Sequence, residues 1–146
     1  MKDETYKYLN RPKKINAKLI ALNEQIGMLR YSLMPSGIRY DQDKVQTSPD
    51  DMLSKVVSEL TALERERDTL CVEANDICNE MRKTFAGLSA PEYSNALVYS
   101  FISCLKYEDA MERMHCSKAQ FFRYRKKGME ELDVIVSKKL RLNETK

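Results

Sequence analysis

The stretch MHCSKAQFFRYRKKGMEEL, residues 114–132, decides the fold expected for the C-terminal part of this chain. Ser117 is followed three residues later by Gln120, which is the spacing of a capping box, so we expect a helix to begin there. No acidic residue offsets the cations between Ser117 and Gly128, yet two phenylalanines lie among them. Such a helix is either a solvated helix with a local excess of charge or one that lies against a negative partner.

Helical periodicity assigns the side chains of this predicted helix to two faces, because successive residues are rotated by about 100° around the axis. We place Phe121 at the centre of the buried face, together with Tyr124, Gly128 and Leu132. The residues expected to point away are Ala119, Phe122, Arg123 and Lys126. The outward face is therefore predicted to be cationic, small at its start, and to carry one exposed aromatic ring.

A short helix expected from Tyr107 to Met114 precedes this one, and the three-residue turn HCS joins the two. This arrangement is typical of a helix-turn-helix, whose second helix enters the major groove of DNA with small and cationic residues outward. Arginine can bind guanine through two hydrogen bonds, lysine and arginine neutralise phosphates, and an exposed Phe can contact a thymine methyl group. The alternative is that Phe122 packs into the core and the cations form an ordinary solvated face.

The DNA-binding hypothesis assigns roles to eight residues. Base edges are expected to be contacted by Phe122, Arg123 and Lys126, next to the small Ala119. Phosphates are expected to be contacted by Lys118, Gln120, Arg125 and Lys127.

The segment LSAPEY repeats the start signal, since Ser89 with Glu92 has capping-box spacing and Pro91 fits the first turn. A third amphipathic helix is expected to follow, with its apolar positions at Tyr93, Leu97, Val98, Phe101, Ile102 and Leu105.

Two long apolar stripes precede these helices, each with alternating spacings of four and three residues. The first stripe consists of Ile15, Leu19, Leu22, Ile26, Leu29 and Leu33. The second consists of Val56, Leu60, Leu63, Arg67, Leu70, Ala74, Ile77 and Met81, with Arg67 as its polar member. Pro, Gly, Ser and Asp between them predict a loop, and Ser48 with Pro49 suits the start of the second helix.

We therefore predict an all-α chain. Residues 1–86 are expected to form a long antiparallel helical hairpin with a loop at about 34–50, and residues 87–146 a small helix-turn-helix domain. The stripes leave open whether the hairpin closes on itself, forms a coiled coil between chains, or does both. In each case the hairpin is expected to mediate oligomerisation, as a dimer, or to bind a partner protein.

Composition restricts the function further. The chain has 146 residues and a formal net charge of +3, and it shows neither the apolar run of a signal peptide nor a membrane-length segment, so we expect a cytoplasmic protein. Cys71, Cys78, Cys104 and Cys116 lack Cys-x-x-Cys spacing and are expected to be free, mostly buried thiols. His115 is the single histidine and has no suitably spaced partner. We expect no metal, no cofactor and no enzymatic activity.

Residues 100–132, SFISCLKYEDAMERMHCSKAQFFRYRKKGMEEL, resemble the fourth region of bacterial sigma factors. That region has the pattern R-Y-L-x-G-L-S-x-E-E-I-A-x-x-L-G-x-S-x-x-T-V-x-x-x-x-x-R-A-L-x-x-L, and the register holds without a gap, with Ser117 at the cap. Met111 and His115 stand where the pattern has Ala and Gly, and a non-glycine residue at that turn position costs about 1 kcal/mol.

With the hairpin and the segment SGIRYDQDKV in its loop, the whole chain is similar to the phage transcriptional regulators of the RinA and ArpU kind. The resemblance implies binding of double-stranded DNA that activates phage genes in the host cell, near the nucleoid, and no catalytic activity. Host RNA polymerase is a further expected partner, contacted by the hairpin.

Two other functions remain open. In the first, a degenerate sigma-like domain binds polymerase or a regulator without touching DNA. In the second, the chain is a DNA-packaging adaptor, which would assemble into rings of many subunits, whereas a regulator is expected to be a dimer or monomer.

Overall fold

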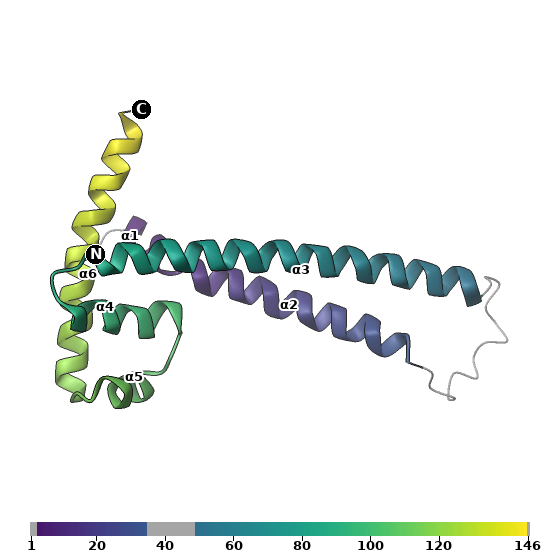
Figure 1. Cartoon of the computed structure of the whole chain (residues 1–146), viewed down its shortest axis with the longest axis horizontal. Coiled ribbons are helices and arrows are strands. Elements are labelled where there is room, and N and C mark those ends of the chain that lie inside the picture. The colour runs from purple at the N-terminus through teal and green to yellow at the C-terminus, as the bar shows by residue number, and fades with distance from the viewer. Residues whose placement is uncertain (1–2, 35–48, 146) are drawn as a thin grey trace. The chain divides into compact units, whose positions relative to one another are not determined.

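The computed structural model describes residues 3–34 and 49–145, and every element in these ranges is helical, which confirms the all-α prediction. Figure 1 shows the elements in order. They are α1 (Asp3–Leu9), α2 (Arg11–Ser32), α3 (Pro49–Ala86), α4 (Pro91–Leu97), the π-helical turn η2 (Val98–Ile102), α5 (Tyr107–Met114) and α6 (Lys118–Glu144).

The chain divides into two compact units. The hairpin unit is Asn16–Glu73, and the terminal unit combines Met1–Ile15 with Ala74–Lys146. The predicted boundary at residue 86 stays a prediction, but the first residues of the chain and the end of α3 group with the C-terminal helices. The reason is a shared apolar core, which the spacing pattern of a single helix cannot reveal.

In the hairpin unit, α2 and α3 run antiparallel, as the two stripes predict (Figure 1). Leu22 and Ile26 are buried on α2, and the α3 positions of the second stripe are half-buried within this unit, Arg67 included. Arg30 donates to Glu64 across the pair, with 2.6 Å between Nη2 and Oε1. The predicted loop and the Ser48 cap lie outside the described residues, apart from the loop's ends, and α3 begins at Pro49 as expected.

The core of the terminal unit draws on four helices and the segment after α3. Its buried members are Leu9 of α1, Met81 and Phe85 of α3, Leu88, Leu97 of α4, and Leu132 and Val136 of α6. Phe85, Met81, Leu97 and Leu132 are completely buried. Because α6 contributes to this core through its second half, the N-terminal residues and the end of α3 are tied to the helix that carries the cationic stretch.

Polar contacts fix α1 and α3 to α6 around this core. Thr5 is fully buried on α1 and donates a hydrogen bond to the carboxylate of Asp133 on α6. Lys139 Nζ of α6 donates to Thr84 Oγ1 of α3 over 3.1 Å. Helix α1 was not expected from the sequence, because its seven residues are too few to show an apolar period.

The start of α4 differs from the prediction. Ala90, not Ser89, is the N-cap, and no side chain caps the helix, so the predicted Ser89–Glu92 capping box is wrong. Pro91 lies in the first turn, which places Ser89 one residue too early to cap. Ser89 instead donates its backbone N–H, over 2.9 Å, and its hydroxyl to Glu131 of α6. These two hydrogen bonds hold the pKa of Glu131 below its ordinary value.

The third predicted helix also changes its winding before it ends. After Leu97 the chain forms the π-helical turn η2, in which Ser103 N bonds to Val98 O over 2.9 Å. Cys104 then adopts a left-handed conformation with φ of 52°, and Leu105 N bonds back to Tyr99 O. Helix α5 begins after this turn at Tyr107, as predicted.

The four cysteines are free, as predicted, but they are not mostly buried, since Cys71 and Cys104 are exposed and Cys78 and Cys116 are half-buried. Cys71 and Cys78 lie on α3 outside its apolar stripe, and Cys104 and Cys116 lie in the turns before and after α5. Within residues 3–34 and 49–145, no cluster of His, Cys, Asp or Glu could hold a metal ion. None of the described helices is long and apolar enough to cross a membrane.

Gly128 of α6 lies in close contact with α4. A Cβ added there would lie 3.2 Å from Leu97 Cγ and Cδ1 and from the carbonyl oxygen of Tyr93, which is too close for ordinary packing. Gly27, on α2, has nothing within 4 Å of such a Cβ. The glycine at position 128 therefore serves packing, whereas the one at position 27 does not.

We predict that Gly128→Val lowers the free energy of unfolding by about 1–3 kcal/mol, because the new side chain overpacks the α4–α6 contact. The matched variant Gly27→Val should be neutral or slightly stabilising, since valine has the better helix propensity and meets no neighbour. Urea unfolding followed by circular dichroism measures both. Equal effects of the two substitutions would contradict the close approach at Gly128.

Candidate nucleic-acid interface

Helices α5 and α6 are joined by a tight turn at the residues HCS. His115 adopts the left-handed conformation, with φ of 52° and ψ of 45°, as expected for a position where the sigma-factor pattern has glycine. The N–H of His115 donates to Glu112 O, and the N–H of Cys116 donates to Met111 O. These bonds close the end of α5 and turn the chain toward α6.

Ser117 starts α6 through a complete capping box, which confirms the prediction. Its hydroxyl accepts from Gln120 N over 3.3 Å, and the Gln120 side-chain oxygen accepts from Ser117 N over 3.2 Å. Gln120 was expected to contact phosphate, but its side-chain oxygen is engaged in holding the start of the helix.

A second apolar core lies beneath the two helices. Ala96 of α4, Ala110 of α5 and Phe121 of α6 are fully buried in it, and two small residues allow the three helices to pack closely. Half-buried side chains surround these three, namely Tyr99, Met111, Met114, Cys116, Phe122 and Tyr124. Met111, where the family pattern has alanine, thus packs at the edge of this core. The inward positions of Phe121, Gly128 and Leu132 are confirmed.

The outward face of α6 is cationic. Ala119, Arg123 and Lys126 are exposed there, and Lys118 and Lys127 are exposed at its sides. Among the described residues no acidic side chain forms an ion pair with any of these four cations, so their charge is available to an external anion. Lys118 lies over the ring of Tyr107, with its Nζ 5.2 Å from the ring centroid.

Phe122 does not project from this face as expected. It is half-buried, with its ring centroid 5.5 Å from that of Tyr107 and 5.4 Å from that of Phe121. The physical reason is its angle of about 100° from Phe121, which places it at the border of the buried face. Tyr107, at the start of α5, then covers it. Sequence reasoning gave no role to Tyr107. The only signal for one was that an aromatic residue stands at the predicted first position of this helix.

Arg125 is also placed differently from the expectation. It is half-buried, its guanidinium lies 5.2 Å from the centroid of the Phe101 ring, and its Nε is buried without a hydrogen-bond partner in the described structure. It lies about 40° from Phe121 around the helix, and therefore on the inner side of α6. A phosphate bound to the outward face would not meet this guanidinium.

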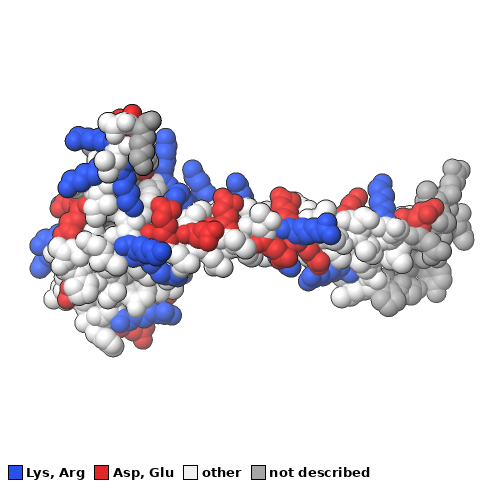
Figure 2. All heavy atoms as spheres, turned by 45° about the horizontal axis from the view of Figure 1, so that its top comes forward, with Lys and Arg blue, Asp and Glu red and all other residues white. Residues whose placement is uncertain are grey.

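The structure thus brings five of the eight predicted residues together on one exposed face and assigns three others to contacts within the domain. Charges of opposite sign lie nearby, because Glu108, Asp109 and Glu112 are exposed on α5. Figure 2 shows a further group of Lys and Arg side chains over the C-terminal part of α6, where Lys138, Lys139 and Arg141 are exposed. Sequence reasoning missed this group, although the run KKLR signals it.

A comparison with protein families identifies the chain. The model described as "Protein of unknown function (DUF1492)" matches residues 34–133, which is more than half of the chain. The chain belongs to this family. The match includes α3, α4, α5 and the cationic part of α6. No curated protein matches the chain, and no solved structure does.

We predict that His115→Gly raises the free energy of unfolding by up to about 1 kcal/mol, because glycine adopts the left-handed conformation without a steric penalty. The control Glu112→Gly, at an exposed helical position of α5, should lower it by about 1 kcal/mol. Urea unfolding of both variants provides the measurement. If the two glycines destabilise the chain equally, His115 does not hold the left-handed turn.

Proposed function

We propose that this member of the DUF1492 family is a phage-type transcriptional regulator, an activator that binds double-stranded DNA through α5 and α6. The observation that carries the proposal is the exposed face of α6, on which Arg123, Lys126 and Lys127 surround the small Ala119 and have no acidic partner among the described residues. The capped turn before it gives this face a fixed orientation.

The chemistry of these residues suits the major groove. Ala119 lets the helix approach the base edges, and Arg123 can bind guanine through two hydrogen bonds. Lys126 lies on the same face, while Lys118 and Lys127 lie at its sides, where phosphates would pass. The proposal leaves out Gln120, Phe122 and Arg125, because each has a role inside the domain.

The proposal also includes a homodimer or a contact with host RNA polymerase through the hairpin unit. Exposed apolar side chains on α2 support this part, since Ile20, Met28 and Tyr31 are each more than half exposed. Large apolar side chains grouped on a surface are typical of protein contacts. The similarity of the chain to regulators of the RinA and ArpU kind points the same way.

A second candidate function is a protein-binding module that does not touch DNA. Glu108 and Asp109 favour it, because both are exposed in the first turn of α5 and would repel a phosphate near them. The two candidates differ in their response to salt, since DNA binding through lysine and arginine weakens steeply as salt rises.

We predict that Arg123→Ala and Lys127→Ala weaken DNA binding in different ways. Sequences selected from random DNA by the full chain supply the preferred site, and fluorescence anisotropy across a salt series measures affinity. Arg123→Ala should weaken the preferred site by roughly tenfold to a hundredfold and random duplex far less, because base contacts discriminate. Lys127→Ala should weaken both and lower the salt slope by about 1.

The control is Lys55→Ala, an exposed lysine on α3 outside the proposed surface, which should change neither affinity. If Arg123→Ala and Lys127→Ala lose equal affinity for the preferred site and for random duplex, Arg123 does not contact a base. An absence of salt-dependent binding at low ionic strength would contradict the proposal and favour the protein-binding module.

A further inference from the structure

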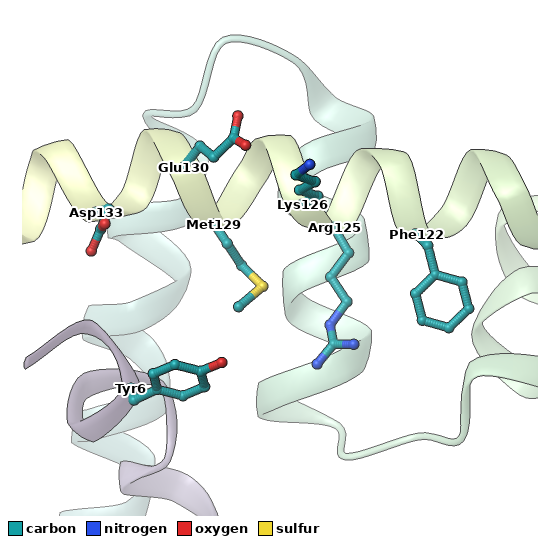
Figure 3. Close-up of a pocket in the computed structure, with 7 residues that line it drawn as sticks. All are labelled: Tyr6, Phe122, Arg125, Lys126, Met129, Glu130 and Asp133. Carbon is teal, nitrogen blue, oxygen red and sulfur yellow. The ribbon is translucent and has the colours of Figure 1, made fainter. Parts of the chain in front are cut away.

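A groove of about 320 Å³ lies between α1 and α6, within the terminal unit. Its lining comes from Tyr6 of α1 and from six residues of α6, namely Phe122, Arg125, Lys126, Met129, Glu130 and Asp133. Figure 3 shows the side chains of Tyr6, Met129 and Arg125 directed into the same space. The groove therefore combines three aromatic or apolar residues with two cationic and two anionic ones.

Arg125 and Lys126 both line this groove without an ion pair to a described acidic side chain, and of the two Arg125 is the more buried. Its guanidinium lies over Phe101, and its Nε is buried without a hydrogen bond in the described structure. The acceptors nearby do not meet this need: Asp133 accepts from Thr5, and Glu130 forms no ion pair with Arg125. A guanidinium stays charged at any ordinary pH and binds a carboxylate through two parallel hydrogen bonds.

The other residues of the groove indicate which chemical groups a ligand would carry beside a carboxylate bound to Arg125. Tyr6 is half exposed, and Met129 and Phe122 are half-buried, so they offer apolar surface beside the guanidinium. From Arg125 to Asp133 the helix rises about 12 Å, which is the length of roughly four residues of extended peptide. A ligand that fills the groove thus presents a carboxylate at one end and an apolar side chain along it.

We infer that this groove binds a peptide segment of a partner protein, in which one Asp or Glu pairs with Arg125 and a neighbouring aromatic or aliphatic side chain packs between Tyr6 and Met129. A single carboxylate at the Arg125 end fits better than nucleic acid, because Glu130 and Asp133 line the same groove and would repel the successive phosphates of a nucleic acid. The inference does not depend on DNA binding, since the groove and the exposed face of α6 use different residues apart from Lys126.

The probe is a peptide obtained by selection from a displayed random library on the full chain and then synthesised with a fluorescent label. The expected result is enrichment of sequences in which Asp or Glu lies next to an aromatic or aliphatic residue. A library that yields no enriched peptide, or only peptides without a carboxylate, overturns the inference.

Variants then locate the peptide. Arg125→Gln should weaken binding of the selected peptide by roughly tenfold to a hundredfold, the range measured for a lost charged hydrogen bond. Arg125→Lys keeps the positive charge and should lose less affinity for the peptide than Arg125→Gln does. The matched control is Arg123→Gln, an exposed arginine two residues away and outside the groove, which should bind the peptide as the parent chain does. Circular dichroism establishes that each variant is folded.

The apolar side of the groove is tested in the same titration. Tyr6→Ala should weaken the peptide several-fold, whereas Tyr31→Ala, an exposed tyrosine on α2, should not. Unchanged peptide binding in Arg125→Gln would overturn the inference, as would a loss of peptide binding in Arg123→Gln equal to that in Arg125→Gln. A failure of DNA binding alone would leave the peptide measurements unaffected, so the two proposals can fail separately.

Discussion

The close approach of α4 and α6 at Gly128 is the contact on which the rest of the terminal unit depends. On one side of it, Phe121 is buried with Ala96 and Ala110 beneath the helix-turn-helix. On the other side, Leu132 and Val136 are buried with residues of α1 and α3. One continuous helix therefore belongs to two apolar cores. Because both cores hold it, α6 cannot rotate about its axis, and the direction of its cationic face is fixed.

Sequence rules predicted those features of the fold that are determined within a single helix, and they failed for features that depend on contacts between helices. The stripes on α2 and α3 and the Ser117 capping box were predicted correctly, since spacing and capping act within a single element. The Ser89 capping box failed, because Glu131, far along the chain, takes both hydrogen bonds from Ser89. Helix α1 and the π-helical turn η2 were missed, since their stability comes from tertiary contacts rather than from their own sequence.

The same difference between features set within one helix and features set by neighbouring helices applies to the candidate DNA-binding residues. The exposure of Ala119, Arg123, Lys126 and Lys127 follows from helical periodicity alone, and the structure agrees with it. Phe122 and Arg125 lie at the borders of the buried face, where the neighbouring helices decide what a side chain contacts. Tyr107 and Phe101, from elements before α6, cover them. A sequence can name the residues at such a border, but the packing partners come only from the fold.

Backbone amide chemical shifts, measured during titration with a selected duplex, test most directly whether the exposed face of α6 binds DNA. We expect the largest changes on residues 118–127 and expect them to diminish with added salt, while amides of the hairpin unit change little. Unchanged shifts at residues 118–127, with or without changes elsewhere, would contradict DNA binding by this face.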